Sequence, residues 1–287
     1  MNPYTIITDS GCDIDINTLE QWGVKCADLT VRNVEDSRMY LNREIKPEKF
    51  YTEMREGIVF QTSAVNPDGF KRVLSEELEQ GNDVICLCLS SGISTTYQSA
   101  EIAAMDLADQ YPDRKIIIVD SLCASEGGGL LVYLALEKKK AGASIEEVEA
   151  FVKETIPVLS HWFTVDDLKY LKRGGRISPT AAFAATVLDI KPVMHVDDEG
   201  KLVGVSKVRG RRQAIKAIAD KYSEMSADPD NGIYFISHGD CAGDAAILES
   251  MIEEKHGCKA THIGYVGPVI GAHSGPGTLA LFFIGKR

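Results

Sequence analysis

The chain has 287 residues, of which 44% are hydrophobic and 25% charged, and its formal net charge is −11. This composition can build a substantial globular core, and the length fits one large or two medium domains. The acidic balance argues against a nucleic-acid-binding protein, which normally carries a basic face, and no run reaches the roughly 18 apolar residues of a membrane span.

The N-terminus, the cysteines and the histidines bear on compartment and metal binding. MNPYTIITDSGCD has no basic region followed by an apolar one, so we expect a cytoplasmic protein without a secretory signal. The seven cysteines include no C-x-x-C pair, and Cys86 and Cys88 in the apolar run DVICLCLSS favour buried thiols over a metal pair. The histidines show no metal-ligand spacing, and His256 and His262 are expected at the surface. We therefore predict no metal site.

The first half of the chain alternates short apolar runs with segments of helical character. Strands are predicted over 4–10, 83–91 and 114–121, and helices over 94–111, 127–142 and 143–159. A capping box of Ser144 and Glu147 begins the last helix, and Pro157 ends it. Continuous apolar strands separated by helices are typical of a parallel sheet buried on both faces.

Beyond about residue 158 the pattern changes to hairpins mixed with crossover helices. Further strands are predicted over 161–167, 190–210 (a hairpin turning at 198–200), 232–239, 259–267 and 278–286. Helices are predicted over about 211–222 and 245–254, and another begins at Ser178 with Pro179 in its first turn. We therefore predict two α/β domains: residues 1–158 with a mainly parallel, Rossmann-like sheet, and residues 159–287 with a mixed sheet.

Small polar residues gather where the predicted strands of the first half end. Such segments lie at 8–13, 89–97 and 119–129, and a fourth at 60–70 carries Thr62 ahead of a predicted helix start. Ligands of open α/β sheets bind at the carboxyl ends of strands, so these clusters predict a binding site that the second domain covers. For any single hydroxyl, such as that of Ser94, helix capping is the simpler interpretation.

The segment VGPVIGAHSGPG, residues 266–277, places glycines and prolines on both sides of His273. So many helix-breaking residues predict a tight, non-helical loop. Either this is a surface turn that happens to carry a histidine, or the loop directs the imidazole of His273 at a ligand.

Two basic clusters stand out in this acidic chain. KRGGRI contains Lys172, Arg173 and Arg176, and VRGRRQ contains Arg209, Arg211 and Arg212. A basic cluster is usually a solvated face, but two in one domain also suit an anionic headgroup or an acidic partner surface. Common nucleotide-binding, zinc-protease and serine-hydrolase motifs are absent, so we predict a binding protein without a cofactor rather than an enzyme.

Several motifs together resemble those of the DegV family, from end to end and in the family's order. They are IITDSGCDI, TSAVNP, LSSGISTTYQSA, VDSLCASEGGGLLV, LKYLKRGGRIS, DIKPVMHVDDEGKL, SHGD and GPVIGAHSGPG. That family includes the fatty-acid-binding subunits of bacterial fatty acid kinase. The resemblance implies that a long-chain fatty acid, such as palmitate, stearate or oleate, lies in a tunnel between the two domains. It also implies that Thr62, Ser94 and His273 hold the carboxylate, which the catalytic subunit of a fatty acid kinase phosphorylates to an acyl-phosphate.

The resemblance extends to the surroundings of that carboxylate. Ser63, Thr95 and Ser274 are predicted beside it, and Arg173, Arg176 and Arg209 are expected to dock the kinase or the phosphorylated headgroup. Thr95 departs from the family, which commonly has glycine after the helix-opening serine. The segment TAAFAATVL around Phe183 offers small side chains beside an acyl chain, although close helix packing through alanine explains it equally well.

Three other functions fit parts of the pattern. A hydrolase in which His273 activates Ser94 lacks a motif for an orienting group and an oxyanion hole. A kinase related to dihydroxyacetone kinases needs clustered acidic metal ligands and a nucleotide site, which the sequence does not show. A lipid storage or transport module without a kinase partner is compatible with every motif.

Overall fold

The computed structural model describes residues 2–177 and 189–286. In the first half its elements are β1 (Tyr4–Asp9), η1 (Ser10–Cys12), α1 (Ile16–Trp22), β2 (Lys25–Ala27), β3 (Thr30–Asn33), β4 (Met39–Leu41), α2 (Pro47–Arg55), β5 (Phe60–Ser63), α3 (Pro67–Leu78), β6 (Asp83–Cys88), α4 (Thr96–Ala108), β7 (Ile116–Asp120), α5 (Glu126–Lys140), α6 (Ile145–Thr155) and η2 (Ile156–Val158). In the second half they are β8 (Leu159–Thr164), α7 (Lys169–Gly174), β9 (Ile190–Val196), β10 (Leu202–Arg209), α8 (Arg211–Met225), β11 (Tyr234–His238), α9 (Ala242–His256), β12 (His262–Tyr265), α10 (Pro268–Ser274) and β13 (Leu279–Ile284). No helix in these two stretches combines the length and the apolar character that crossing a bilayer requires.

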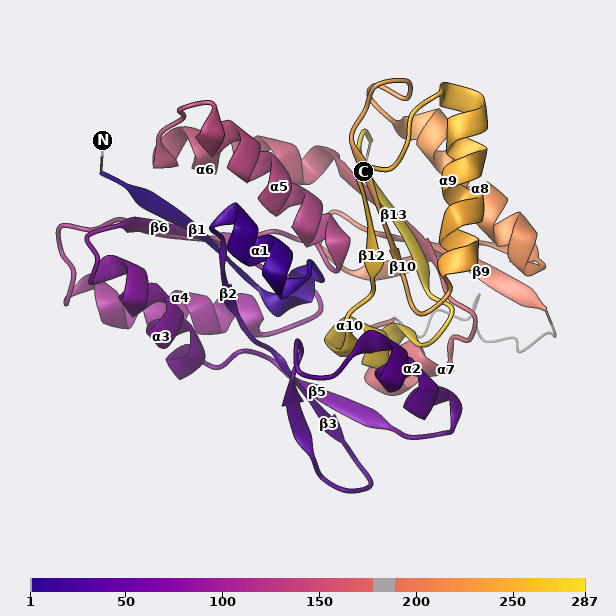
Figure 1. The fold of residues 1–287 in the computed structure, drawn as a ribbon, viewed down its shortest axis with the longest axis horizontal. Helices are drawn as coiled ribbons and strands as arrows, with labels where there is room; N and C mark the ends of the chain where they lie inside the picture. Colours follow the sequence, from indigo (N-terminus) through magenta and orange to yellow (C-terminus); the bar gives the residue numbers. More distant parts are fainter. Residues whose placement is uncertain (1, 178–188, 287) are drawn as a thin grey trace.

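The described strands form three sheets, ordered β2-β1-β6-β7, β10-β9-β8-β13-β11-β12 and β4-β3-β5. In the first sheet every pair of neighbours is parallel. Helices α3 and α4 cover one face of it, and α5 and α6 cover the other (Figure 1). All six residues of β6 are buried, as expected for a strand between two helical layers. The predicted parallel sheet is confirmed, and so are the two core thiols, since Cys86 and Cys88 lie buried with their sulfurs 3.6 Å apart.

A small antiparallel sheet between residues 30 and 63 was not part of the sequence prediction. Its middle strand β3 pairs with both β4 and β5. Thr62 and Ser63 therefore lie in β5 of this sheet and not at the edge of the parallel sheet. The expectation that four polar clusters share one sheet edge was wrong for the cluster at 60–70. These strands are only three or four residues long, which leaves little periodicity for a sequence reading to detect.

The mixed sheet of the second half is confirmed. Strands β9 and β10 form the predicted antiparallel hairpin, and β11 pairs in parallel with β12 but antiparallel with β13. Helices α8 and α9 pack on one face of this sheet. Helix α5, which follows β7 of the parallel sheet, packs against β8, β11 and β13 as well as against β1 (Figure 1).

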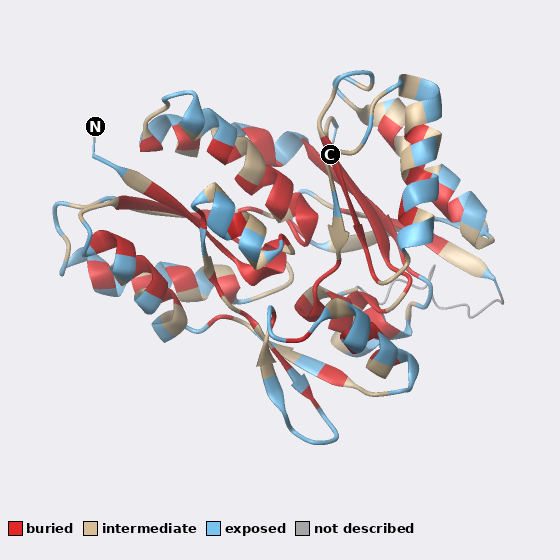
Figure 2. Ribbon diagram, viewed as in Figure 1, coloured by how far each residue is buried: buried red, intermediate tan, exposed pale blue. Residues whose placement is uncertain are grey.

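Helix α5 lies between the two large sheets and joins their cores. Figure 2 shows buried residues concentrated in the strands of both sheets and along this helix. One hydrophobic cluster contains Ile85 of the parallel sheet, Leu131 of α5 and Phe282 of the mixed sheet. The strands before and after residue 158 belong to separate sheets, but they share this core, and the predicted division into two domains stays a prediction.

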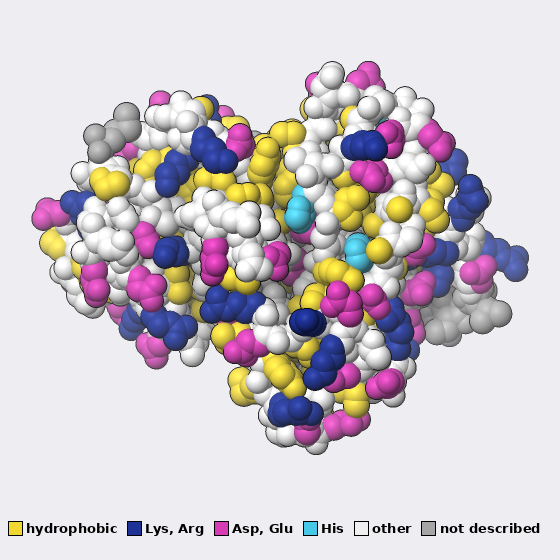
Figure 3. All heavy atoms as spheres, in the orientation of Figure 1, with side chains coloured by type: hydrophobic (Ala, Val, Ile, Leu, Met, Phe, Trp, Pro, Cys, Tyr) yellow, Lys and Arg dark blue, Asp and Glu magenta, His cyan; other side chains and the backbone are white. Residues whose placement is uncertain are grey.

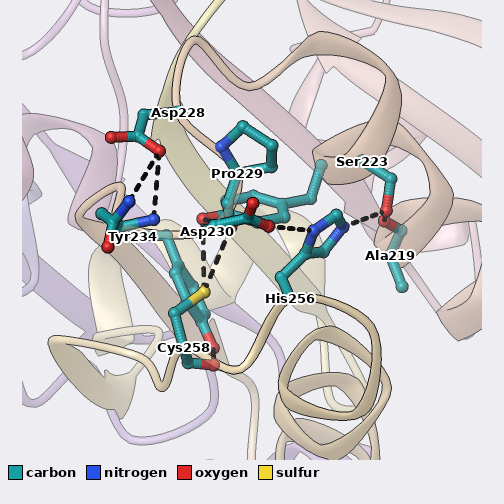
Figure 4. A network of polar contacts seen from close by, with 10 residues as sticks. Ala219, Ser223, Asp228, Pro229, Asp230, Tyr234, His256 and Cys258 are labelled. Atoms are coloured by element: carbon teal, nitrogen blue, oxygen red, sulfur yellow. Dashed lines mark hydrogen bonds and ion pairs between the residues drawn. The ribbon is translucent and has the colours of Figure 1, made fainter.

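Two histidines expected at the surface are instead partly buried and paired, so that expectation was wrong. His262 Nε2 lies 3.3 Å from a carboxylate oxygen of the buried Glu126. His256 lies between Asp230 and Ser223, with Nδ1 3.0 Å from Asp230 and Nε2 2.7 Å from Ser223 (Figure 4). The imidazole of His256 thereby connects the end of α9 to α8 and to the loop before β11.

Candidate functional site

A cavity of about 890 Å³ lies between the parallel sheet and the mixed sheet. Its volume falls within the roughly 300–1,000 Å³ of small-molecule sites. Most of its wall is apolar and comes from both halves of the chain, including Leu89, Ala124, Phe163, Leu171, Val269 and Phe282. On the face drawn in Figure 3, hydrophobic side chains also gather along the junction of the two halves, whereas charged side chains spread over their outer sides. The wall is suited to a ligand that is largely apolar.

Thr62 and His273 form a polar pair in this wall. They are 211 residues apart in the chain, yet Oγ1 of Thr62 lies 2.8 Å from Nε2 of His273. Strand β5 supplies the threonine and helix α10 the histidine, and α10 packs directly on β3 and β5. Both residues line the cavity, as does Ser94. The structure thus brings the three residues predicted to hold a carboxylate to one cavity.

Helix α10 corrects the prediction of a non-helical loop around His273. The helix-breaking residues lie at the ends of α10 and do not interrupt it. Pro268 is the first helical residue, and Gly275, with φ of 85°, follows the last one. Proline is tolerated at this first position because the N–H it lacks would have no partner there. A residue with a side chain is disfavoured at the φ of Gly275, and a Cβ there would collide with the ring of Tyr170. His273 therefore occupies a fixed position in the last turn of a short helix.

The environment of His273 favours its neutral form. Burial is the main cause that lowers the pKa of His273 to about 4, and the positive charges of Arg176 and Arg173 contribute to the same shift. Its Nδ1 is buried against Gly174 and has no hydrogen-bond partner among the described residues. At neutral pH the imidazole carries one N–H, which it can donate to a ligand beside Thr62.

Ser94 has a local role as well as a place in the cavity wall. Its hydroxyl lies 2.8 Å from Oγ1 of Thr96 and accepts a hydrogen bond from the N–H of Thr96 at the start of α4. The simpler interpretation, helix capping, therefore also describes this residue. The hydrogen-bonding partner of His273 is Thr62 and not Ser94, so the pair that a serine hydrolase needs is not formed.

Of the other three residues predicted at the headgroup, two line the cavity and one is exposed elsewhere. Thr95 and Ser274 line the cavity, and the buried hydroxyl of Ser274 has no hydrogen-bond partner within residues 2–177 and 189–286. Thr95 is the N-cap residue of α4, without a side-chain capping bond. Ser63 follows Thr62 in β5 and is exposed, because successive side chains of a strand point to opposite faces.

The three predicted arginines are all exposed, and one of them lines the cavity. Arg176 does so, and it donates to the carbonyl oxygens of Ile93 and Gly174. Arg173 lies over the ring of Tyr170, 5.3 Å from its centroid. Arg209 is the last residue of β10 and is absent from the described wall of the cavity. Positive charge at the cavity thus comes from Arg176, just after α7, and from Lys201 in the β9–β10 hairpin.

Several residues of the wall were not predicted. His161, Phe163 and Phe282 face the cavity from the mixed sheet, and Ser125 and Ser237 add hydroxyls. Ser125 lies in the polar segment 119–129 that pointed to a binding site, although it was not singled out. The other four resemble residues of any buried strand, so no local signal separates them from the ordinary core. The predicted helix start at Ser178 and Pro179 and the segment around Phe183 lie outside the described residues. In the described part of the chain, no three His, Cys, Asp or Glu side chains are placed to hold a metal ion.

Comparisons with known proteins agree with this geometry. A family model described as an uncharacterised protein of the DegV family matches residues 3–286. A DegV domain-containing protein of Clostridium perfringens is 40% identical over 287 residues, which cover 99% of this chain and 98% of the relative. A solved structure described as the fatty acid binding of a DegV family protein from Thermus thermophilus matches with a TM-score of 0.88 and 30% identity, covering 99% of each chain. A stearic-acid-binding protein from Eubacterium ventriosum matches with a TM-score of 0.88 and 26% identity, covering 99% of this chain and 98% of that one.

Proposed function

The chain belongs to the DegV family, and on that premise we propose that it binds one long-chain fatty acid in the cavity. The single observation that supports this most directly is the largely apolar cavity of about 890 Å³ with Thr62, Ser94 and His273 among its lining residues. Solved relatives described as binding fatty acids, including stearic acid, share this fold. Palmitate, stearate and oleate are the ligands we expect.

The energetics of an acyl chain match such a wall. Each buried methylene contributes ~0.8 kcal/mol, so the fourteen methylenes of palmitate contribute roughly 11 kcal/mol before the costs of binding. The carboxylate then needs only enough donors to replace water. The hydroxyls of Thr62 and Ser94 and the neutral imidazole of His273 provide them without a buried counter-charge, and the hydroxyl of Ser274 is available beside them.

Ligand binding is tested on protein purified from bacteria. We expect native mass spectrometry to show a mass increase equal to one fatty acid. Delipidated protein should melt at a lower temperature and recover when palmitate, stearate or oleate is added, because a ligand of the folded state stabilises it. An empty protein whose melting temperature does not respond to any of the three acids would overturn the proposal.

We further propose that a fatty acid kinase catalytic subunit uses the bound acid as its substrate. An oxygen of the carboxylate attacks the γ-phosphorus of ATP, the bond to the ADP oxygen breaks, and acyl-phosphate and ADP result. The exposed Arg173 and Arg209, and Arg176 at the cavity wall, supply positive charge for the partner or for the phosphorylated headgroup.

Charge reversal separates this step from ligand binding. We expect Arg173→Glu and Arg209→Glu to slow acyl-phosphate formation in the presence of the kinase while fatty-acid affinity stays within about twofold of wild type. An equal loss of affinity and turnover would place these arginines in the carboxylate site instead. Tight fatty-acid binding with no acyl-phosphate formed by any kinase subunit would favour a storage or transport module.

A further inference from the structure

A second group of polar side chains lines the cavity on the side of the mixed sheet. Ser125 is the N-cap residue of α5, Ser237 lies in β11 and His161 lies in β8, and all three are buried. Ser237 pairs with Ala280 across the sheet and His161 pairs with Phe282. Because directly paired residues point to the same face, and because Ala280 and Phe282 also line the cavity, this polar group faces the space that the acyl chain would occupy.

The hydrogen bonds within this group leave the hydroxyl of Ser237 able to accept a further hydrogen bond. The hydroxyl of Ser125 donates to Oδ2 of Asp13 at 2.6 Å, which uses its only proton. The hydroxyls of Ser125 and Ser237 are 3.1 Å apart, so the proton in that contact comes from Ser237. The oxygen of Ser237 then keeps its lone pairs, and the described residues give it no partner other than Ser125.

Protonation of Asp13 reverses the donor and acceptor roles along Asp13, Ser125 and Ser237, but Ser237 still has one hydrogen-bonding function without a partner. Burial raises the pKa of Asp13 well above its usual range, while the hydrogen bond from Ser125 opposes that rise. If Asp13 is protonated, it donates to Ser125, Ser125 donates to Ser237, and Ser237 has a proton left to give. In both states one hydrogen-bonding function of Ser237, either a lone pair or its proton, has no match among the described residues.

The second histidine of the wall is an acceptor. Nδ1 of His161 lies 3.0 Å from the carbonyl oxygen of Leu159, and because a carbonyl only accepts, Nδ1 carries the proton. In the neutral imidazole Nε2 therefore has the lone pair, and it lies against Gly127 at the start of α5. A methylene chain offers no hydrogen bond to the hydroxyl of Ser237. A hydroxyl can both donate and accept, so it matches Ser237 in either state of Asp13.

We propose that Ser237, held by Ser125, forms a subsite for a hydroxyl group carried within the acyl chain, so that hydroxylated long-chain fatty acids are ligands of this protein. The ligand hydroxyl bonds to Oγ of Ser237, at a place separate from the carboxylate at Thr62 and His273. This inference rests on the proposed function, since it requires a fatty acid in the cavity.

The expected effect is a change in selectivity. A hydroxyl buried without a partner weakens binding by roughly tenfold to a hundredfold, whereas a paired one is nearly neutral. We expect the wild-type protein to bind 10-hydroxystearate or 12-hydroxystearate at least as tightly as stearate. Ser237→Ala should keep its affinity for stearate and lose tenfold or more for that hydroxystearate. Since both ligands are measured on one variant, any change in folding cancels in their ratio.

Ser160→Ala is the matched control, because Ser160 is a buried serine of the same sheet whose hydroxyl is directed to the carbonyl of Lys286 and not to the cavity. It should keep the wild-type ratio. A wild-type protein that binds both hydroxystearates tenfold more weakly than stearate would overturn the subsite alone. An unchanged ratio in Ser237→Ala would do the same. Failure of stearate itself to bind would overturn the proposed function and the subsite together.

Discussion

Replacing Thr62 with valine tests the carboxylate site with the least change in shape. Valine has a methyl group where threonine has its hydroxyl, so Thr62→Val removes the contact of 2.8 Å to His273 without opening a void. Loss of a hydrogen bond to a charged group costs about 1.5–3 kcal/mol. We therefore expect fatty-acid affinity to fall by roughly tenfold to 150-fold.

Fatty acids of different chain length show whether the binding free energy lost in Thr62→Val comes from the headgroup or from the acyl tail. Laurate, myristate, palmitate and stearate differ only in methylenes, each worth ~0.8 kcal/mol or about fourfold in affinity. If Thr62 contacts only the headgroup, wild type and Thr62→Val should give parallel lines when binding free energy is plotted against chain length. Isothermal titration calorimetry of the delipidated proteins measures both the slope and the offset.

Two further variants sharpen the test. Thr52 is exposed on α2, and among residues 2–177 and 189–286 its hydroxyl bonds only to the carbonyl of Glu48, so Thr52→Val should bind every acid as wild type does. The double variant Thr62→Val/His273→Ala should lose less than the sum of its single variants, because the two side chains contact each other. An unshifted line for Thr62→Val would refute the assignment of Thr62 to the carboxylate. A loss that grows with chain length would place Thr62 along the tail.

Two other predictions concern stability. The lowered pKa of His273, about 4 against ~6.5 in the unfolded chain, means that the stability from its neutral form is complete above pH 6.5 and is lost as pH falls towards 4. In urea titrations near pH 7 and pH 4, wild type should lose about 3 kcal/mol more than His273→Gln, and an equal loss in both proteins would contradict this. A Cβ at Gly127 would collide with Nε2 of His161, whereas one at Gly128 would have only ordinary contacts at 3.6 Å. Gly127→Ala should therefore destabilise the fold by about 1–3 kcal/mol, while Gly128→Ala should be neutral or stabilising, and equal unfolding free energies would count against this packing.

Local sequence determined the elements whose signals are short-range. The apolar run of β6, the capping box of Ser144 and Glu147 and the hairpin at 190–209 follow from periodicity and turn chemistry, and the structure confirms each of them. The short motifs also identified the family. Each motif alone is weak evidence, but many of them in the family's order are specific. The short strands β3, β4 and β5 and the helix α10 were not predicted, since three to seven residues carry too little pattern to outweigh the glycines and prolines beside them.

Only the tertiary structure decided how the site is assembled. The sequence placed Thr62, Ser94 and His273 together at a carboxylate and offered Ser94 as the residue that His273 would activate in a hydrolase. The packing of α10 on the small antiparallel sheet placed Thr62 against His273 instead. The same packing buried His273 and lowered its pKa, and the meeting of α5 with the mixed sheet put Ser125 beside Ser237, 112 residues away in the chain. Contacts of this kind depend on which faces of distant elements are buried together, and a side chain's own neighbours in sequence do not carry that information.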